Sequence, residues 1–456
     1  MTFKCLVRDA IESMSGSVPA IDVNIDPNTP ISGVSTDSRN IKSGDLFIAL
    51  VGENFDGHKF VERSIDRGAV VAVVDRTFSD RSHLPLLIVP NTLKAYQDLA
   101  HWWRNQSNLP VVAVTGSAGK TTTKELISTL LDRYTQPSKK VHKSLANHNN
   151  DIGVAQTLLS IDPNKHDFAI VEMGMRGRGE IARLAAIARP TVGVITNIGT
   201  AHIGRLGSKQ AIAAAKCELL EQMPTDSIAV LNGEDQLLLD FASKVWHGQT
   251  ITYGIGVGDV NGELAGNTLK VAGFEFDLPI LGRHNALNLL AALAVVKALG
   301  LDWQVLDRDL GSLTLPEGRA QVHHLAGDVM ILDETYNASP EAVIAALDLL
   351  ADTPATRRWA ILGTMKELGD ASEALHAQVG RKAKELGIDR LLVLTDGESD
   401  AILRGAGSGM GYTSGDEIVQ ELLQSVKSGD RILFKASHSV GMDRLVRDFQ
   451  LGWQQR

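Results

Sequence analysis

The segment best suited to chemistry is a short loop between an apolar run and a helical pattern. Residues 111–114 are apolar, and Thr115-Gly116-Ser117-Ala118-Gly119-Lys120-Thr121-Thr122 follows, leading into a helical pattern over 123–131. Such a loop can turn its backbone N–H groups toward phosphate oxygens, and the helix start adds positive potential. Lys120 would reach the outer phosphates of a nucleotide, and the Thr121 hydroxyl would ligate Mg²⁺.

The loop matches the shorter pattern Gly-x-x-Gly-Lys-Thr, because Val114 stands where the longer form has glycine. The alternative is an ordinary strand-to-helix turn with a surface lysine. Since a strand and a helix flank the loop in the right order, we interpret residues 116–122 as a phosphate-binding loop. Such a loop indicates a nucleotide and leaves the reaction open.

Three further polar groups lie near predicted strand ends or on a nearby helix. Glu172 follows the apolar run 168–171, where a hard carboxylate would suit Mg²⁺ or simply be solvated. His202 lies in a glycine-containing loop after residues 192–196. It could be a metal ligand, a group that supports a ligand, or a structural residue. Lys216 lies on an alanine-rich helical pattern, and its periodicity alone predicts a solvated side chain.

The elements that must position these groups alternate between strands and helices. Short apolar runs occur at residues 111–114, 168–171, 192–196 and 228–231, with helical patterns between them and a last one over 284–299. This alternation predicts a parallel sheet with helices on both faces.

Two smaller α/β units flank this region, as expected of 456 residues, which are too many for one compact domain. We expect domains at 1–85, 86–315 and 316–456, with a linking helix over 93–105. The first contains strand-like runs at 45–50 and 69–74 around a helix near 60–67, and we expect the segment 85–90 to end it. The third alternates strands at 329–333, 359–362, 390–394 and 431–435 with helices such as 340–350.

Composition excludes several classes of protein. A formal charge of −9 argues against nucleic-acid binding, because phosphate backbones reward basic surfaces. Cys5 and Cys217, the two cysteines, form no metal-ligand pair and fit a reducing compartment. The start lacks a secretory apolar region, and no apolar run reaches bilayer length. We therefore expect a cytoplasmic protein without membrane insertion.

Six motifs in order resemble those of the Mur ligase family, and the resemblance spans nearly the whole chain. They are Thr-Gly-Ser-Ala-Gly-Lys-Thr from 115, Glu-Met-Gly from 172, Asn-Ile-Gly-Thr-Ala-His-Ile-Gly from 197, Ala-Lys-Cys-Glu from 215, Gly-Arg-His-Asn-Ala-Leu-Asn from 282 and Asp-Glu-Thr-Tyr-Asn-Ala-Ser-Pro from 333.

The resemblance implies a three-domain α/β fold with a central P-loop ATPase domain on a parallel sheet. A small N-terminal UDP-binding domain and a C-terminal Rossmann-like ligase domain would flank it. It implies ATP and two Mg²⁺ ions as cofactors, with Lys120, Glu172, His202 and Lys216 in the catalytic centre. Thr121, Glu172, His202 and Lys216 would bind metal, Lys216 after carbamylation by CO₂. The implied ATP-binding residues are Gly116, Ser117, Ala118, Gly119, Lys120, Thr121, Thr122, Asn285, Asn288, Arg319, Asp333, Tyr336 and Asn337.

Within the family, the chain is most similar to members that add D-alanyl-D-alanine to a UDP-N-acetylmuramoyl tripeptide. The supporting segments are residues 35–58, 146–153 and 336–340, and the sequence lacks the Asp-Asn-Pro-Arg of the diaminopimelate-adding relative. The resemblance implies these two small molecules as partners of an enzyme expected to be monomeric. It implies substrate contacts from Ser38, Arg39, Asn147, Asn149, Asn150, Lys435 and Ser437.

The chain departs from the family pattern at three positions: Ser339 replaces an asparagine, and Ala436 and His438 stand where glycine and arginine are expected. Simpler roles remain open, because the asparagines at 147–150 could form a turn and Lys435 could be a solvated charge. The alternative functions are those of a tripeptide-forming relative, a folylpolyglutamate synthetase, or an NTPase switch that hydrolyses nucleotide to control a partner.

Overall fold

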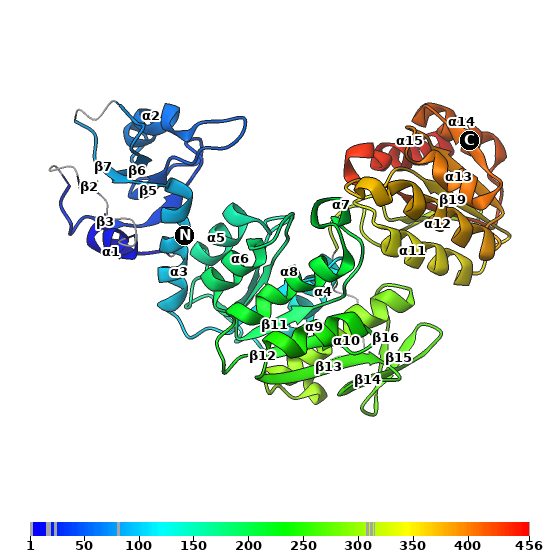
Figure 1. Ribbon diagram of the computed structural model, residues 1–456, viewed down its shortest axis with the longest axis horizontal. Helices are drawn as coiled ribbons and strands as arrows, with labels where there is room; N and C mark the ends of the chain where they lie inside the picture. Colours follow the sequence, from blue (N-terminus) through cyan, green and yellow to red (C-terminus); the bar gives the residue numbers. More distant parts are fainter. Residues whose placement is uncertain are drawn as a thin grey trace.

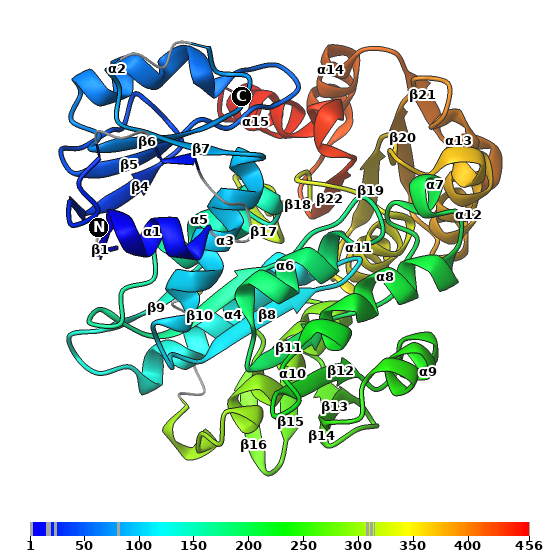
Figure 2. The ribbon, with the colours of Figure 1, turned by 60° about the vertical axis from the view of Figure 1, so that its left-hand side comes forward.

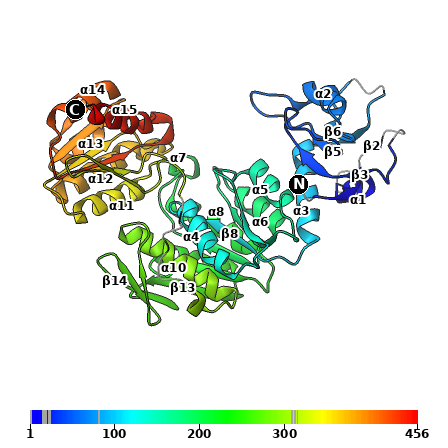
Figure 3. The same ribbon diagram turned by 180° about the vertical axis from the view of Figure 1, so that it is seen from behind.

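The computed structural model describes residues 3–14, 20–21, 25–79, 83–306, 310, 313 and 315–455. Three lobes follow one another along the chain, each built around its own large β-sheet (Figure 1). The N-terminal and C-terminal lobes lie at opposite ends of the central lobe (Figures 1 and 3). This confirms the predicted three-domain α/β architecture.

The N-terminal lobe is a five-stranded sheet of order β2-β7-β6-β5-β4, parallel except for β2. Its elements are β1 (Cys5–Leu6), α1 (Val7–Ser13), β2 (Ala20–Ile21), β3 (Pro30–Ile31), β4 (Gly33–Ser35), β5 (Asp45–Ile48), η1 (Gly57–Phe60), α2 (Val61–Asp66), β6 (Val71–Asp75) and β7 (Leu86–Val89). Strand β7 completes the sheet, so this lobe runs past residue 85 into the segment 85–90 that was expected to end it. Pro85 precedes the strand without interrupting it, since its carbonyl still accepts the N–H of Ala72 at 2.9 Å.

Helix α3 (Thr92–Asn105) joins the N-terminal and central lobes, as the expected linking helix over 93–105 should. Asn91 caps it, because its side chain accepts the backbone N–H of Lys94 at 2.9 Å. Ala95 and Leu99 belong to one apolar core that includes Leu87 of the N-terminal sheet and Val111 of the central sheet. The two lobes are therefore connected through continuous packing as well as through the chain.

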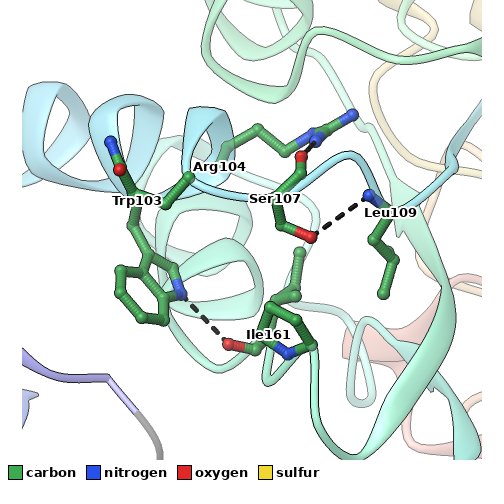
Figure 4. A pocket seen from close by; sticks show the side chains of 7 residues that line it. Trp103, Arg104, Ser107, Leu109 and Ile161 are labelled. Atoms are coloured by element: carbon green, nitrogen blue, oxygen red, sulfur yellow. Dashed lines mark hydrogen bonds between the residues drawn. The ribbon is translucent and has the colours of Figure 1, made fainter.

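A small cavity lies at the end of α3 (Figure 4). Its volume is about 40 Å³, and its lining includes Trp103, Arg104, Leu109 and Ile161. The Trp103 indole donates to the Ile161 carbonyl at 3.0 Å, and Arg104 donates to the Ser107 carbonyl at 2.7 Å. Pockets for organic ligands measure roughly 300 Å³ or more, so this cavity is too small to hold one.

The central lobe contains a nine-stranded sheet of order β16-β15-β14-β13-β12-β11-β8-β10-β9. Its strands are β8 (Val111–Thr115), β9 (Lys140–Lys143), β10 (His166–Glu172), β11 (Val192–Ile195), β12 (Ile228–Asn232), β13 (Gln249–Ile255), β14 (Val260–Ala265), β15 (Thr268–Val271) and β16 (Phe274–Asp277). Its helices are α4 (Lys120–Leu131), η2 (Asp132–Tyr134), α5 (Asp151–Leu159), α6 (Glu180–Ala188), α7 (Ile203–Leu206), α8 (Lys209–Gln222), α9 (Gln236–Val245), α10 (Arg283–Ala298) and η3 (Trp303–Val305).

Alternating residues of β8 fill the cores on the two faces of this sheet. Val112 and Val114 pack in the core that contains α4 and α10, whereas Val111 and Ala113 pack with α3, α5, α6 and α8. The predicted helix–sheet–helix layering is therefore confirmed. The sheet is not wholly parallel, because β14, β15 and β16 add antiparallel pairs at one edge. Gly266 and Gly273, with φ of +58° and +82°, make the two tight turns that these pairs require.

The C-terminal lobe is a six-stranded sheet of order β17-β18-β22-β19-β20-β21, parallel except for β17. Its strands are β17 (Gln321–Leu325), β18 (Val329–Asp333), β19 (Arg357–Leu362), β20 (Arg390–Leu394), β21 (Met410–Tyr412) and β22 (Asp430–Lys435). Its helices are α11 (Pro340–Asp352), η4 (Gly369–Ala371), α12 (Ser372–Glu385), α13 (Asp400–Ala406), α14 (Gly415–Ser425), η5 (His438–Val440) and α15 (Met442–Gln454).

The departure at Ser339 has a local explanation. Ser339 is the N-cap of α11, where its hydroxyl accepts the N–H of Ala342 at 3.4 Å and Pro340 occupies the first turn. Serine and asparagine are both favoured N-caps, so the helix keeps its start with either residue.

Helix α7 lies between the central and C-terminal lobes and is drawn in front of the C-terminal lobe in Figure 2. Its neighbour in the C-terminal lobe is η4, and the Gly204 N–H donates to the Glu367 carbonyl at 3.0 Å. Across the described part of the chain, every helix is too short or too polar to span a lipid bilayer.

Candidate active site

The predicted phosphate-binding loop lies between β8 and α4, and two glycines set its shape. Gly116 has φ +149°, and a Cβ there would lie 1.8 Å from the Thr196 hydroxyl oxygen. Gly119 is the left-handed N-cap of α4, with φ +81°, and a Cβ there would lie 2.5 Å from the Asn288 side-chain oxygen. Both positions therefore exclude a side chain. The N–H groups at the start of α4 have no partners within the helix and form the kind of end that binds anions.

The segment after β11 holds the loop in place. The backbone N–H of Ser117 donates to the Asn197 carbonyl at 3.1 Å, and that of Ala118 donates to the Asn197 side chain at 3.0 Å. The Thr196 hydroxyl donates to the Ala118 carbonyl at 2.6 Å, and the Ser117 hydroxyl accepts the N–H of Gly199 at 2.8 Å. The loop is thereby fixed before any nucleotide binds.

Lys120 folds back over the loop. Its ammonium donates to the Gly116 carbonyl at 2.7 Å. Burial lowers the pKa of Lys120; nearby Glu172 opposes this shift, whereas Arg319 adds to it. An anion near this group would favour its charged form. The arrangement suits a lysine that exchanges backbone carbonyls for phosphate oxygens.

Thr121 and Glu172 meet at the carboxyl ends of β8 and β10, as expected of two ligands to one metal ion. The Thr121 hydroxyl donates to one carboxylate oxygen of Glu172 at 2.9 Å, and the Asn149 amide donates to the other at 2.8 Å. Both Thr121 and Glu172 are 2% exposed. Their hard oxygen donors fit Mg²⁺, which usually takes one or two protein ligands together with phosphate oxygens and water. Within the described ranges, no three His, Cys, Asp or Glu side chains converge on a possible metal position.

Lys216 is buried, in contrast to what its helical periodicity predicted. It lies on α8 at 2% exposure, and no hydrogen bond or ion pair of its ammonium occurs among the described residues. Burial, reinforced by nearby Lys120, lowers the pKa of Lys216 well below its ordinary value. Its amine is therefore readily neutral, which is the form that can react with CO₂.

His202 lies in the loop after β11 with a left-handed backbone, φ +67°. Its Nδ1 pairs with the carboxylate of Glu367, a residue of the C-terminal lobe. Burial lowers the pKa of His202, Glu367 raises it, and Lys120 and Lys216 lower it further. His202 therefore lies close to both lysines of the predicted site, while its ring is engaged across the domain boundary.

Asn285 and Asn288 lie at the start of α10, beneath the loop. Asn288 accepts the Thr123 hydroxyl at 3.2 Å and donates to Asn285 at 3.1 Å, and Asn285 donates to the Leu281 carbonyl at 2.8 Å. In this structure the pair joins α10 to α4. Their expected role near adenine stays a prediction.

The expected nucleotide contacts of the C-terminal lobe gather around one aromatic ring. The Arg319 guanidinium lies 3.7 Å from the ring centroid of Tyr336, and the His438 ring lies 5.5 Å from it on centroids. Among the residues that the structure describes, the buried Nε of Arg319 has no hydrogen-bond partner. Asp333 ends β18 and accepts both the N–H and the hydroxyl of Thr335, at 3.0 and 2.6 Å.

Lys435 and Ser437 are used within the C-terminal lobe. The Lys435 ammonium donates to the Asn337 carbonyl at 3.0 Å and pairs with the Glu334 carboxylate at 3.3 Å. The Ser437 hydroxyl accepts the N–H of Lys366 at 2.9 Å. Lys435 is therefore a buried, paired cation instead of a solvated charge, and substrate contacts of both residues stay predictions.

The three asparagines predicted to bind substrate have different local roles. Asn150 is the N-cap of α5, because its side chain accepts the N–H groups of Ile152 and Gly153 at 3.2 and 2.9 Å. Asn149 holds Glu172, as described above, and the carbonyl of Asn147 accepts the N–H of Asn149 at 2.7 Å. The alternative of a turn-forming segment therefore fits Asn147 and Asn150.

Ser38 and Arg39 lie in the N-terminal lobe, in a turn after β4. The Ser38 carbonyl accepts the Arg67 guanidinium at 2.9 Å, and Arg39 forms an ion pair with Asp37 at 2.8 Å. Both groups are thus placed on one edge of that lobe, and contact with UDP stays a prediction.

Sequence reasoning missed two glutamates of the C-terminal lobe that reach the loop after β11. Glu341, in the first turn of α11, accepts the N–H and the hydroxyl of Thr200, each at 2.9 Å, and pairs with Lys209 at 3.3 Å. Glu367 pairs with His202 and also with Arg205 at 3.3 Å. Glu341 is 141 residues from Thr200, and Glu367 is 165 residues from His202. No local sequence pattern could therefore reveal these contacts.

Comparison with known proteins agrees with this geometry. Family models described as "Mur ligase family, catalytic domain", "Mur ligase middle domain" and "Mur ligase, glutamate ligase domain" match residues 30–104, 114–296 and 318–438. A Synechocystis protein named UDP-N-acetylmuramoyl-tripeptide–D-alanyl-D-alanine ligase is 48% identical over 444 residues, covering 96% of each chain.

Solved structures show the same architecture. A crystal structure of MurF from Acinetobacter baumannii is 29% identical, with a TM-score of 0.88 over 98% of this chain and 99% of that one. MurF from Thermotoga maritima in complex with ADP is 29% identical, with a TM-score of 0.83 over 93% of this chain and 98% of that one. The match over 96% of the chain, together with the three family models and a phosphate-binding loop joined to Glu172, places this chain in the Mur ligase family.

Proposed function

We propose that this protein uses ATP to join D-alanyl-D-alanine to a UDP-N-acetylmuramoyl tripeptide through an acyl-phosphate intermediate. The observation that carries the proposal is the meeting of Lys120, Thr121 and Glu172 at one sheet edge, in a chain 48% identical to a ligase named for that reaction. The product would be the UDP-muramyl pentapeptide used in peptidoglycan synthesis.

The chemistry requires ATP because a carboxylate is a poor electrophile. The terminal carboxylate of the tripeptide attacks the γ-phosphorus, the bond to ADP breaks, and an acyl phosphate forms. Lys120 stabilises the charge on the transferring group, since its ammonium can leave the loop carbonyls for phosphate oxygens. The free amine of D-alanyl-D-alanine then attacks the acyl carbon, and inorganic phosphate leaves with the acyl oxygen.

Thr121 and Glu172 would hold a Mg²⁺ ion of the nucleotide, and His202 and Lys216 would serve a second. Bound Mg²⁺ would supply charge stabilisation on the phosphates. Lys216 would serve as a carbamate: its neutral amine adds to the carbon of CO₂ and releases one proton, which turns a potential cation into an anion. The burial of Lys216 and its lowered pKa support this step.

Domain movement would complete the site. Asp333 and Tyr336 would contact the nucleotide, and closure of the C-terminal lobe would exclude water from the acyl phosphate. The Arg319 guanidinium against the Tyr336 ring supports this assignment, because two expected nucleotide contacts already lie together.

The decisive experiment traces the oxygen atoms of the tripeptide carboxyl group into the released phosphate. Tripeptide substrate labelled with ¹⁸O in its terminal carboxyl group should give ¹⁸O in the released phosphate, and release should depend on D-alanyl-D-alanine. Product formation with unlabelled phosphate would contradict the acyl phosphate. Phosphate release without any peptide acceptor would instead favour an NTPase switch.

A substrate panel separates the related ligases. UDP-muramyl dipeptide with amino acids tests the tripeptide-forming activity, and folate with glutamate tests the folylpolyglutamate activity. We expect turnover only with the tripeptide and D-alanyl-D-alanine.

A further inference from the structure

Lys124 is a buried cation on the second turn of the phosphate-loop helix, and neither the motif nor the proposed mechanism uses it. Its side chain is 1% exposed, although lysine is rarely buried without strong partners. Its ammonium donates to the Ser144 carbonyl at 2.9 Å, and it lies 3.2 Å from a carboxylate oxygen of Glu125 and 3.6 Å from one of Glu172. One ammonium therefore joins three segments of the chain.

The cluster around Lys124 is balanced in charge. Glu125 also pairs with Lys143 at 2.5 Å, so two lysines face two glutamates. The side chains of Lys124, Glu125 and Glu172 are 1%, 9% and 2% exposed, whereas that of Lys143 is 36% exposed. Lys143 is thus the outer member, and Lys124 is the inner one that reaches Glu172.

Glu172 is held from several sides at once. Thr121 and Asn149 each donate to one of its oxygens, and Ser144 accepts the N–H of Glu172 through its hydroxyl at 3.1 Å. Because Lys124 binds the Ser144 carbonyl and lies beside the oxygen that Thr121 contacts, it connects the carboxylate to the segment that carries Asn149.

We propose that Lys124 is a positioning residue that holds the Glu172 carboxylate and the 144–149 segment in the arrangement that binds the magnesium ion of the nucleotide. This inference rests on the proposed function, since Glu172 must be a metal ligand. It adds a residue that contacts neither nucleotide nor substrate. Groups that orient a metal ligand commonly change metal affinity by about 10- to 100-fold when they are removed.

Charge and orientation predict opposite results when Lys124 is replaced. A positive ammonium near Glu172 repels a divalent cation, so removing it would tighten metal binding if only charge mattered. If Lys124 orients the carboxylate, its loss weakens metal binding even though a repelling charge has gone. The sign of the change therefore identifies the role.

The experiment measures Mn²⁺ binding to the protein with saturating ADP by electron paramagnetic resonance, without turnover. We expect Lys124→Met to weaken Mn²⁺ binding by about tenfold or more. Lys143→Met is the matched control, because it removes one lysine charge from the same cluster without touching Glu172, and it should change binding by less than about threefold. Unchanged or tighter binding in Lys124→Met overturns the proposal.

Two further variants keep the test decisive. If Lys124→Met fails to fold, the pair Lys124→Met with Glu125→Gln restores the charge balance, and neutral replacements of buried ion pairs are often tolerated. The double variant should show the same loss of Mn²⁺ affinity, and wild-type affinity would refute the positioning role. Glu172→Gln tests whether Glu172 is a metal ligand at all. If Glu172→Gln binds Mn²⁺ normally, the metal role of Glu172 is wrong. If Glu172→Gln loses Mn²⁺ binding while Lys124→Met binds Mn²⁺ normally, only the positioning role of Lys124 is refuted.

Discussion

The imidazole of His202 pairs with the carboxylate of Glu367 across the boundary between the central and C-terminal lobes. Their side chains are 28% and 33% exposed, so the contact is partly shielded from water. The same glutamate also binds Arg205, and its carbonyl accepts the N–H of Gly204. A predicted metal ligand thus forms part of the contact that positions the C-terminal lobe.

Replacing Glu367 by glutamine should loosen this interdomain contact. The variant loses the negative charge that His202 and Arg205 share, which we expect to cost about 1 kcal/mol at such a partly exposed site. Small-angle X-ray scattering of the nucleotide-free protein should show a larger or more variable radius of gyration. Glu373→Gln, which removes an exposed ion pair with Arg404 inside the C-terminal lobe, is the control. Equal scattering from both variants would show that Glu367 does not hold the lobe.

Lys216→Ala should reduce ligation by at least about a hundredfold, because a metal ligand outweighs the supporting groups whose loss costs 10- to 100-fold. Short-chain carboxylates should restore part of the activity by replacing the carbamate. Phosphate release and ¹³CO₂ labelling of the wild-type protein, followed by NMR, are the measurements. Full activity of the variant, or no labelled carbamate, would remove this modification from the mechanism.

Gly116→Ala should weaken ADP binding. The new methyl group would lie 1.8 Å from the Thr196 hydroxyl, so the loop or the Thr196 side chain that holds it must shift. Isothermal titration calorimetry should show at least about tenfold weaker binding, equivalent to one lost hydrogen bond to a charged group. The control is Gly177→Ala, where the nearest atom would lie 3.4 Å away. Retained affinity in Gly116→Ala would mean that the loop adapts.

Asp333→Asn should raise the KM for ATP by about tenfold, the effect of losing one charged hydrogen bond. Asparagine is preferred to alanine here, because its carbonyl oxygen can still accept the Thr335 N–H that shapes the turn. Steady-state kinetics should show a smaller change in the KM for D-alanyl-D-alanine than for ATP. An unchanged KM for ATP would count against contact between Asp333 and the nucleotide.

Acid should destabilise the protein partly through His166. Burial, followed by the neighbouring His142 ring 4.6 Å away, lowers the pKa of His166 from 6.5 to about 4. Between these pH values the unfolded chain binds a proton that the folded chain does not, so stability falls as the pH decreases through this range. Since His166 is partly exposed, solvent screening reduces the size of the effect.

His166→Asn tests this dependence, because an asparagine oxygen can accept the Asp162 N–H that His166 Nδ1 now accepts at 3.0 Å. The melting temperature of the variant should change less between pH 6.5 and pH 4 than that of the wild type. His247→Asn, at an exposed position, should keep the wild-type slope. A wild-type slope in His166→Asn would exclude His166 as a source of acid sensitivity.

The phosphate-binding loop and the elements around it could be predicted from the sequence because their determinants are local. The apolar run of β8, the glycines at 116 and 119 and the helical pattern after Lys120 specify strand, turn and helix within 20 residues. The antiparallel pairs of β14 to β16 were missed, since strand pairing depends on distant neighbours and the local pattern does not distinguish its direction.

The sequence by itself indicated which groups could do chemistry: residue type and motif singled out Lys120, Thr121, Glu172 and His202, and the family resemblance added Lys216. Tertiary structure decided their states. Helical periodicity predicted a solvated Lys216 side chain, whereas packing of α8 against the sheet buries its amine. In the same way, Glu172 gains Asn149 and Lys124, and His202 gains Glu367, through contacts between segments 23 to 165 residues apart. Hydrogen bonds and Coulomb interactions depend on distance in space, whereas a motif records only distance along the chain.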